Sequence, residues 1–304
     1  KVTLTESSSD QVVNVAIAGG SATKGADFLN ASETESITVK YADGSIVTIA
    51  ANVDGTYSVP VKAGQTNFVV QVKTFDDAII ENEENFTLTV KVADKQATST
   101  GTILDNDKPE AVIVPKDPKD PIVEVPKDPN DPTKPLDPKD PSVGTKGAVA
   151  IEGNDLVFTV TVTQSVNVQT YDFKITDGTA TLGEDYTSNN VVFTNGVTYD
   201  AVTGKITVPA GVTAFEVNVK TIDDAIIENT ESLTVSVGTS SAVGYILDND
   251  IEGITIDPNP DPKDPNDPKD LDSKGAKVTE GDTAEFKVTL TESSSDQVVN
   301  VAIA

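Results

Sequence analysis

The sequence predicts an all-β chain in which two antiparallel sandwiches of the immunoglobulin type are joined by proline-rich, extended linkers. Short runs rich in Val, Ile and Thr alternate between apolar and polar residues, which is typical of half-buried strands. Turn signals separate these runs, and no convincing amphipathic helix lies between them. About seven short strands in roughly 100 residues are typical of such a sandwich. The Cys and Trp pattern of true immunoglobulin domains is missing, so only the architecture is predicted.

Composition narrows the function class. Asp and Glu outnumber Lys and Arg by 49 to 22, so we expect cations as ligands and neither nucleic acid nor an anionic membrane. The chain has no Cys and no His, which excludes disulfides and thiolate sites and removes the commonest general base and the usual zinc ligand. No apolar run approaches the length of a membrane helix, and no signal peptide is visible at residue 1. We therefore expect a soluble piece of a longer protein.

Strand and turn signals follow one another in both halves of the chain. Alternation is clearest in Phe68–Lys73 and again in Phe158–Thr163. Three pairs that tolerate positive φ, Asp43-Gly44, Asp54-Gly55 and Asn195-Gly196, predict tight hairpins. Each half is therefore expected to fold as its own antiparallel sandwich.

A long repeat indicates how the domains are divided. Residues 1–18 recur unchanged as residues 287–304, so the unit repeats every 286 residues. On that period, Val278–Gly281 would precede the residues that Lys1 onward represent. The predicted division is a first domain over 1–107 whose first strand is equivalent to 276–286, a linker over 108–143, a second domain over 144–250, a linker over 251–275, and the start of the next repeat over 276–304.

A spacing comparison supports this division. Glu152 lies 33 residues before Asp185, and Glu280 lies 33 residues before the equivalent of Asp27 in the next repeat. The aromatic residues that follow these two aspartates, Tyr186 and Phe28, are interpreted as core anchors.

The prolines are concentrated in the two predicted linkers. Residues 109–141 and 258–268 hold 15 of the 17 prolines, mostly in Asp-Pro-Lys repeats. Such segments cannot form a helix and have little to bury, so we expect semi-rigid spacers. At about 3.1 Å per residue, the longer one would span on the order of 100 Å. A partner-binding role for these segments has no specific motif behind it.

Acidic phrases occur twice in the same order and are expected to meet at one end of each sandwich. In an antiparallel sandwich, the A–B, C–D and E–F turns and the chain leaving strand G emerge at the same end. In the second domain these places hold eight carboxylates: Glu152, Asp185, Asp223, Asp224, Glu228, Glu231, Asp248 and Asp250. They repel one another, and no basic residue lies inside the phrases. An all-oxygen donor set, with Asn249 counted among the donors, favours Ca²⁺, with more than one ion per domain.

The phrases Glu-Gly, Gly-x-Asp-aromatic, Asp-Asp-x-x-x-Glu-x-x-Glu and Ile-Leu-Asp-Asn-Asp resemble the calcium-binding signature of Calx-β domains. The resemblance covers both domains and omits the linkers. In that family, known from sodium/calcium exchangers and from large bacterial surface adhesins, these phrases ligate a calcium cluster at one end of the sandwich.

The resemblance implies a ligand set in each domain. In the second domain the implied ligands are Glu152, Asp185, Asp223, Asp224, the Ile226 carbonyl, Glu228, Glu231, Asp248 and Asp250. In the first domain they are Asp27, Asp76, Asp77, the Ile79 carbonyl, Glu81, Glu84, Asp105 and Asp107, with Glu280, or its copy before Lys1, in the place of Glu152.

The function we expect is that of a calcium-stabilised structural extender in a large secreted bacterial surface adhesin, resembling the repeats-in-toxin adhesins exported by type I secretion. The alternative is an adhesive module that contacts a surface, a glycan or a neighbouring cell, although aromatic residues make up only 5% of the chain. An enzyme is not expected. The paired carboxylates that glycoside hydrolysis would need all lie in the motifs that resemble the calcium-binding signature. The expected partners are neighbouring repeats of the same chain. Whether the chain ends are a window cut from an array, or complete one another head to tail by strand addition, is left open.

Overall fold

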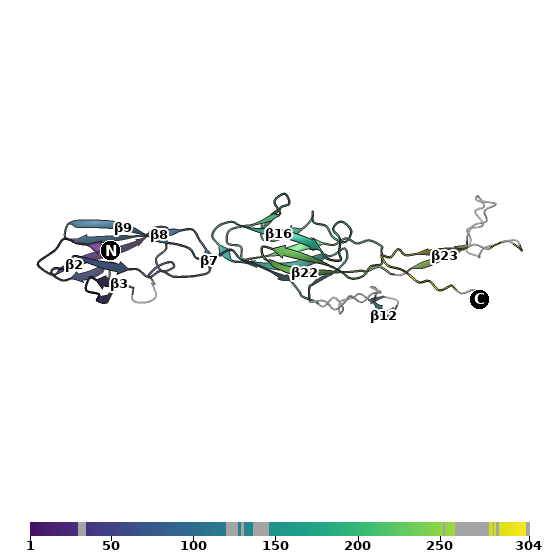
Figure 1. Cartoon of the computed structure of the whole chain (residues 1–304), viewed down its shortest axis with the longest axis horizontal. Helices are drawn as coiled ribbons and strands as arrows, with labels where there is room; N and C mark the ends of the chain where they lie inside the picture. The colour runs from purple at the N-terminus through teal and green to yellow at the C-terminus, as the bar shows by residue number, and fades with distance from the viewer. Residues whose placement is uncertain are drawn as a thin grey trace. The chain divides into compact units, whose positions relative to one another are not determined.

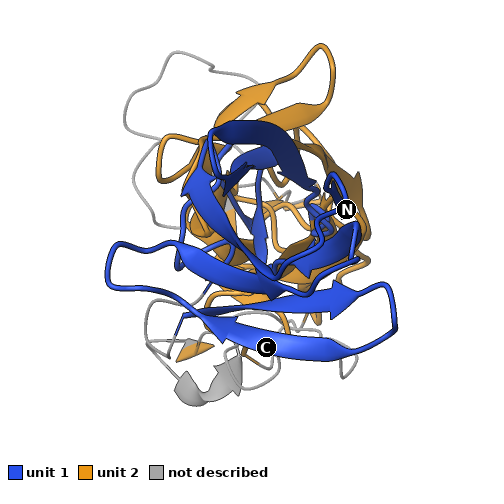
Figure 2. Cartoon of the chain, turned by 90° about the vertical axis from the view of Figure 1, so that its left-hand side faces the viewer, with its two compact units in different colours: residues 1–109, 163–167 blue, residues 110–162, 168–304 orange. Residues whose placement is uncertain are grey.

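The computed structural model describes residues 1–29, 35–119, 127–128, 131–135, 146–251, 253–258, 280–281, 283 and 286–301. In this part of the chain all regular structure is β-strand, which confirms the predicted all-β class (Figure 1). Two compact units are formed, unit 1 from Lys1–Pro109 with Thr163–Asn167 and unit 2 from Glu110–Val162 with Val168–Ala304 (Figure 2). Among the described residues, no helix is long and apolar enough to span a membrane.

Unit 1 contains two four-stranded antiparallel sheets. The first has the order β1 (Val2–Thr3), β6 (Asn67–Gln71), β3 (Ser36–Tyr41) and β4 (Ile46–Ala50). The second has the order β5 (Tyr57–Val61), β2 (Gln11–Gly19), β8 (Glu84–Val92) and β9 (Lys95–Ile103). The short β7 (Ile79–Ile80) pairs with β15 (Gln164–Ser165). Buried and exposed residues alternate along β5 because successive side chains of a strand point to opposite faces.

Unit 2 repeats this arrangement with larger sheets. One sheet has the order β10 (Ala111–Pro115), β14 (Asp155–Val162), β20 (Ala214–Lys220) and β17 (Val192–Phe193). The other has the order β13 (Ala148–Ile151), β22 (Ser240–Leu247), β21 (Glu231–Val237), β16 (Gln169–Asp177), β19 (Lys205–Val208) and β18 (Thr198–Asp200). Two further pairs are β11 (Lys127–Asp128) with β12 (Asp131–Pro135) and β23 (Ile254–Pro258) with β24 (Phe286–Leu290). The pairing of β13 with β22 is parallel, whereas the other pairs in the two large sheets are antiparallel.

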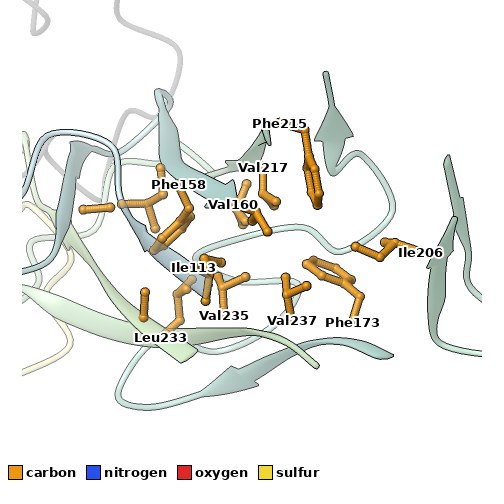
Figure 3. Packing of buried hydrophobic residues seen from close by; sticks show 14 of the residues in the cluster. Ile113, Phe158, Val160, Phe173, Ile206, Phe215, Val217, Leu233, Val235 and Val237 are labelled. Atoms are coloured by element: carbon orange, nitrogen blue, oxygen red, sulfur yellow. The ribbon is translucent and has the colours of Figure 1, made fainter. Parts of the chain in front are cut away.

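The core of unit 2 lies between its two sheets. Phe158 and Val160 of β14 lie across from Val235 and Val237 of β21 (Figure 3), and all four are fully buried. The aromatic residue of the Gly-x-Asp-aromatic phrase, Tyr186, is also buried, as is its counterpart Phe28 in unit 1. The interpretation of these two aromatics as core anchors is confirmed.

The three predicted turns have the expected backbone, but only one is a hairpin between paired strands. Gly44, Gly55 and Gly196 have φ of +86°, +77° and +75°. The Asp43-Gly44 turn joins β3 to its partner β4. The other two turns carry the chain from one sheet to the other, because β4 and β5, like β17 and β18, lie in different sheets.

The structure differs from the predicted linker over residues 108–143 at the start of that segment. Ala111–Pro115 form β10, which pairs with β14 in unit 2, and Ile113 lies opposite Val160 with only 2% of its surface exposed. Pro115 is compatible with this assignment because β10 is an edge strand, where a missing N–H is tolerated. The prediction went wrong because prolines follow this short alternating run closely. The first strand of the second sandwich therefore precedes the Asp-Pro-Lys segment.

Both ends of this segment are held by unit 2. The backbone N–H and C=O of Lys119 and Gly147 exchange hydrogen bonds of 2.9 and 3.0 Å, and Lys116 donates to the carbonyl of Val157. The segment thus leaves and rejoins the same sandwich, and β9 is connected to β10 by residues 104–110 only. Most of the rest of the predicted linker, residues 120–126, 129–130 and 136–145, lies outside the described residues.

The second predicted linker, over residues 251–275, also begins with a strand. Its described part includes β23, which pairs with β24, and residues 259–275 lie outside the described residues.

The position of β10 predicts the effect of shortening its buried side chain. Ile113→Ala is expected to lower the free energy of unfolding of unit 2 by about 2–5 kcal/mol, because it leaves a cavity in a packed core. Urea denaturation followed by the NMR methyl signals of unit 2 measures this value. Val114→Ala, whose side chain is 48% exposed, is the matched control and should change stability by less than about 1 kcal/mol. Equal stability of the two variants would show that this stretch is a spacer and that the pairing with β14 is incorrect.

Candidate metal centres

The pairing of β13 with β22 brings the first group of carboxylates together. Because the two strands run parallel, with Ile151 opposite Leu247, the residues that follow them lie side by side. These residues are Glu152 and Asp248, which are only 7% and 4% exposed. Together with Asp250 they form a group in which one carboxylate oxygen from each residue lies within 4.8 Å of the others.

A second group in unit 2 joins the turn after β16 to the loop between β20 and β21 and to the first residue of β21. Asp185, Glu228 and Glu231 each place a carboxylate oxygen within 4.8 Å of the others. The backbone carbonyl of Asp185 accepts a hydrogen bond of 2.9 Å from Ile222, which fixes the turn against the end of β20. The two groups are neighbours, since the Glu228 N–H donates to Asp248 Oδ2 at 3.1 Å and residues of both groups line one small cavity of about 10 Å³.

Asn249 holds the remaining phrase in place as a hydrogen-bond donor. Its backbone N–H and its Nδ2 donate to Glu152 Oε1 at 3.0 and 3.1 Å, and Nδ2 also donates to Asp223 Oδ1 at 2.9 Å. The Nδ2 group of Asn249 thus bridges two carboxylates, and its Oδ1 stays a predicted oxygen ligand. Asp224 in turn accepts the Ile226 N–H at 2.7 Å. All eight predicted side chains therefore belong to one set of connected loops.

Unit 1 builds the same framework with the matching residues. Asp27, Glu81 and Glu84 form its acidic group, again with carboxylate oxygens within 4.8 Å of one another. The matching hydrogen bonds run from Asn106 Nδ2 to Asp76 (3.0 Å), from the Ile79 N–H to Asp77 (2.8 Å), and from the N–H groups of Glu81 and Asp107 to Asp105 (3.3 and 3.2 Å). A cavity of about 40 Å³ is lined by all seven predicted carboxylates of this unit.

One predicted residue lies elsewhere. Glu280 is exposed in a turn beside Gly281 and belongs to none of the three acidic groups. In the described part of unit 1, no glutamate occupies the place that Glu152 has in unit 2. The Ile79 and Ile226 carbonyls stay predicted ligands, since only their N–H groups make the contacts given above.

Burial and mutual repulsion raise the pKa of the glutamates in these acidic groups. Burial is the main cause that raises the pKa of Glu152 to about 8, that of Glu228 to about 7 and that of Glu231 to about 9. Neighbouring aspartates raise these pKa values further, and for Glu228 and Glu231 the charge of Glu184, which the sequence analysis did not single out, also contributes. In unit 1, burial likewise raises the pKa of Glu81 and Glu84.

The chemistry of these groups fits a hard divalent cation. Each ion pair within the described residues involves other side chains, such as Lys24 with Glu35 and Lys205 with Asp172, so no basic residue there neutralises the acidic groups. The Oδ2 atom of Asp250 is buried without a hydrogen-bond partner. Clusters of carboxylate oxygens of this kind suit Ca²⁺, which accepts six to eight oxygen ligands in flexible geometry.

Comparison with known proteins points to one domain family. A family model described as the Calx-beta domain matches residues 33–117, 146–198 and 192–259. Among solved structures, the crystal structure of calcium binding domain CBD12 of CALX1.1 is similar over 76% of this chain and 68% of its own, with 14% identity and a TM-score of 0.24. Domains 4–9 of the surface layer protein SbsC are similar over 83% of this chain and 33% of theirs, with 14% identity and a TM-score of 0.28. No sequence among the curated proteins matches.

The raised pKa values predict how pH acts on the metal-free protein. A carboxyl group whose pKa is higher in the folded state stabilises folding below its unfolded pKa, and this contribution is lost as pH rises through the folded pKa. With a chelator present, the melting temperature of unit 2 should therefore fall as pH rises from about 5 to about 9.

A variant pair tests the origin of this pH dependence. Glu231→Gln removes the charge and keeps the shape, so it should raise the melting temperature at pH 8.5 in chelator and flatten the pH profile. Asp155→Asn, at an exposed position outside the acidic groups, is the control and should follow the wild type. A melting temperature that rises with pH in wild-type protein without metal would contradict this account.

Proposed function

Because the chain belongs to the Calx-beta domain family, we propose that the acidic end of each sandwich binds calcium and that the bound ions hold the sandwich in its folded state. The observation that carries the proposal is the gathering of carboxylates into groups with oxygens within 4.8 Å of one another and no basic residue among them. Such groups destabilise a fold unless cations balance the charge.

The two acidic groups of unit 2 suggest at least two ions. Glu152, Asp248 and Asp250 would hold one ion, and Asp185, Glu228 and Glu231 would hold another, with Asp223 and Asp224 beside them. When bound, calcium supplies positive charge and coordination. The protein supplies the order of the loops, which Asn249 and the N–H of Glu228 already maintain. Calcium would thereby tie the ends of β13, β20 and β22 to one another.

We further propose that the chain is a structural repeat of a large secreted bacterial surface adhesin of the repeats-in-toxin type, exported by type I secretion. Support comes from the unchanged recurrence of residues 1–18 at 287–304, the absence of Cys and the large acidic excess. Free calcium is low in the cytoplasm and in the millimolar range outside cells, which suits modest-affinity sites. The domains would then stay loosely folded before export and become rigid after it.

The closure of the Asp-Pro-Lys segment onto unit 2 changes how such a repeat makes length. The proline-rich segments were predicted to be extended spacers, but both described ends of the longer one lie on one sandwich. In the proposed extender, the longer proline-rich segment is therefore not the connection between the two sandwiches, and residues 104–110 connect them.

Calcium removal tests the proposed function. Ligand binding that is specific for the folded state adds about 3 kcal/mol per site at a hundredfold excess over Kd. Differential scanning calorimetry in calcium and in chelator should therefore show a large rise in both melting temperatures with calcium, and isothermal titration should show heat of binding. Equal melting temperatures under the two conditions would refute the proposal.

Two single variants test which side chains cause the calcium-induced rise in melting temperature. Asp248→Asn should reduce the calcium-induced rise for unit 2 and leave that of unit 1 unchanged, because its carboxylate links the two acidic groups of unit 2 only. Asp155→Asn is the matched control and should keep the full rise for both units. If Asp248→Asn kept the full calcium-induced rise in the melting temperature of unit 2, the calcium ions would have to bind outside these loops.

A further inference from the structure

The turn between β17 and β18 carries the only Asn-Gly pair of the chain, Asn195-Gly196. A type I′ turn needs positive φ at both of its central residues, and the observed values are +56° for Asn195 and +75° for Gly196. The Val197 N–H closes the turn with a hydrogen bond of 3.2 Å to the carbonyl of Thr194. Asn195 and Gly196 are both exposed, so water reaches the pair.

This pair can react with itself in water. Glycine has no side chain to shield its nitrogen, so an asparagine amide before glycine is open to attack by its own backbone. The nitrogen of Gly196 forms a bond with Cγ of Asn195 and gives its proton to solvent, while the Cγ–Nδ2 bond breaks and the leaving group takes up a proton and departs as ammonia. Water then opens the cyclic imide to aspartate or isoaspartate. The reaction consumes one water, releases one ammonia and needs no other reactant.

In the folded chain the attacking nitrogen is free, whereas the leaving group is held. No described residue accepts a hydrogen bond from the Gly196 N–H. The Asn195 amide, in contrast, donates from Nδ2 to the carbonyl of Ala214 at 2.7 Å, at the start of β20. This bond orients the leaving group toward β20 and therefore opposes rotation of the amide onto the backbone.

Further contacts anchor the turn to β20. The Thr194 N–H donates to the carbonyl of Glu216 at 3.1 Å, and the Glu216 N–H donates to Thr194 Oγ1 at 2.7 Å. The preceding residue, Phe193, lies opposite Val217 in the pairing of β17 with β20. The residue that follows the pair, Val197, is buried in the core. The conformation of Asn195-Gly196 is thus set by the packing of unit 2 and is lost when that unit unfolds.

We propose that Asn195 is a site of spontaneous deamidation that the folded sandwich restrains and that unfolding releases. In the unfolded chain the amide has no fixed partner, and Gly196 adopts many backbone conformations, so the imide forms readily. In the folded chain, the bond to Ala214 and the anchored turn have to open first. Deamidation removes the donor that bonds to Ala214, and isoaspartate adds a main-chain carbon to a two-residue turn. The modification is therefore a lasting record of time spent unfolded.

The rate of deamidation in the folded and the unfolded chain tests this proposal. The whole chain is incubated in calcium at neutral pH, with and without a denaturing concentration of guanidinium chloride, beside a synthetic peptide of residues 190–201. Rapid digestion and mass spectrometry measure the loss of the Asn195 amide. The folded chain is expected to react at least roughly tenfold more slowly than the denatured chain, because a hydrogen bond and a fixed turn have to open first.

Asn52 is an internal control. Its amide is exposed and also hydrogen-bonded, with Nδ2 donating to Thr56 Oγ1 at 3.0 Å, but the next residue is Val53. The branched side chain of Val53 shields the backbone nitrogen, so Asn52 should keep its amide in both conditions while Asn195 loses it in the denatured chain.

A matched pair of variants tests whether the anchored turn is the restraint. Thr194→Ala removes the oxygen that accepts the Glu216 N–H, whereas Thr194→Ser keeps it. We expect the folded Ala variant to lose the Asn195 amide several-fold faster than the folded Ser variant, since one net hydrogen bond is lost. Slow hydrogen exchange of the amide of Val217, which is fully buried in β20, checks that both variants stay folded.

Each outcome decides one part of the proposal. Equal rates in the folded and the denatured chain, or equal rates for the two folded Thr194 variants, would overturn the restraint. An intact Asn195 amide in the denatured chain and in the peptide would overturn the site itself. None of these results would change the calcium-induced rise in melting temperature, because Thr194, Asn195 and Ala214 belong to none of the acidic groups.

Discussion

The repulsion among carboxylates at the end of each sandwich is the constraint on which the rest of the structure depends. An antiparallel sandwich tolerates almost any loop sequence at its ends, but this chain places Glu152 and Asp248, both nearly buried, next to each other. Removing two charges from water costs several kcal/mol each unless opposite charge compensates. Hydrogen bonds from Asn249 and the N–H of Glu228 offset part of this cost and fix the loops. The remaining excess of negative charge is what the proposed calcium ions would balance.

The strands position these carboxylates through their pairing. The parallel pairing of β13 with β22 sets Glu152 beside Asp248, and it is an exception in a fold that is otherwise antiparallel in its large sheets. β13 reaches this position because β10 has already placed the chain on the opposite sheet, with the Asp-Pro-Lys segment between the two strands. A long polar insertion is tolerated there, since loop closure costs only about 0.6 kcal/mol more for each doubling of loop length. The segment can therefore vary in length without moving the metal ligands.

Much of this could be predicted from the sequence, and the failures have clear physical reasons. Alternating Val and Thr residues and the repeated acidic phrases indicated the sandwiches and which side chains would meet, because strand parity is a property of chain order. The strand Ala111–Pro115 was missed because its five residues adjoin a proline-rich segment, and only burial of Ile113 identifies it. The hydrogen bonds that the Nδ2 of Asn249 donates to Glu152 and Asp223 could not be predicted either, since composition cannot tell which carboxylates an amide group will meet. The local sequence pattern therefore specifies most strands. Tertiary packing decides which short segments join a sheet as edge strands and which groups the side chains contact through hydrogen bonds.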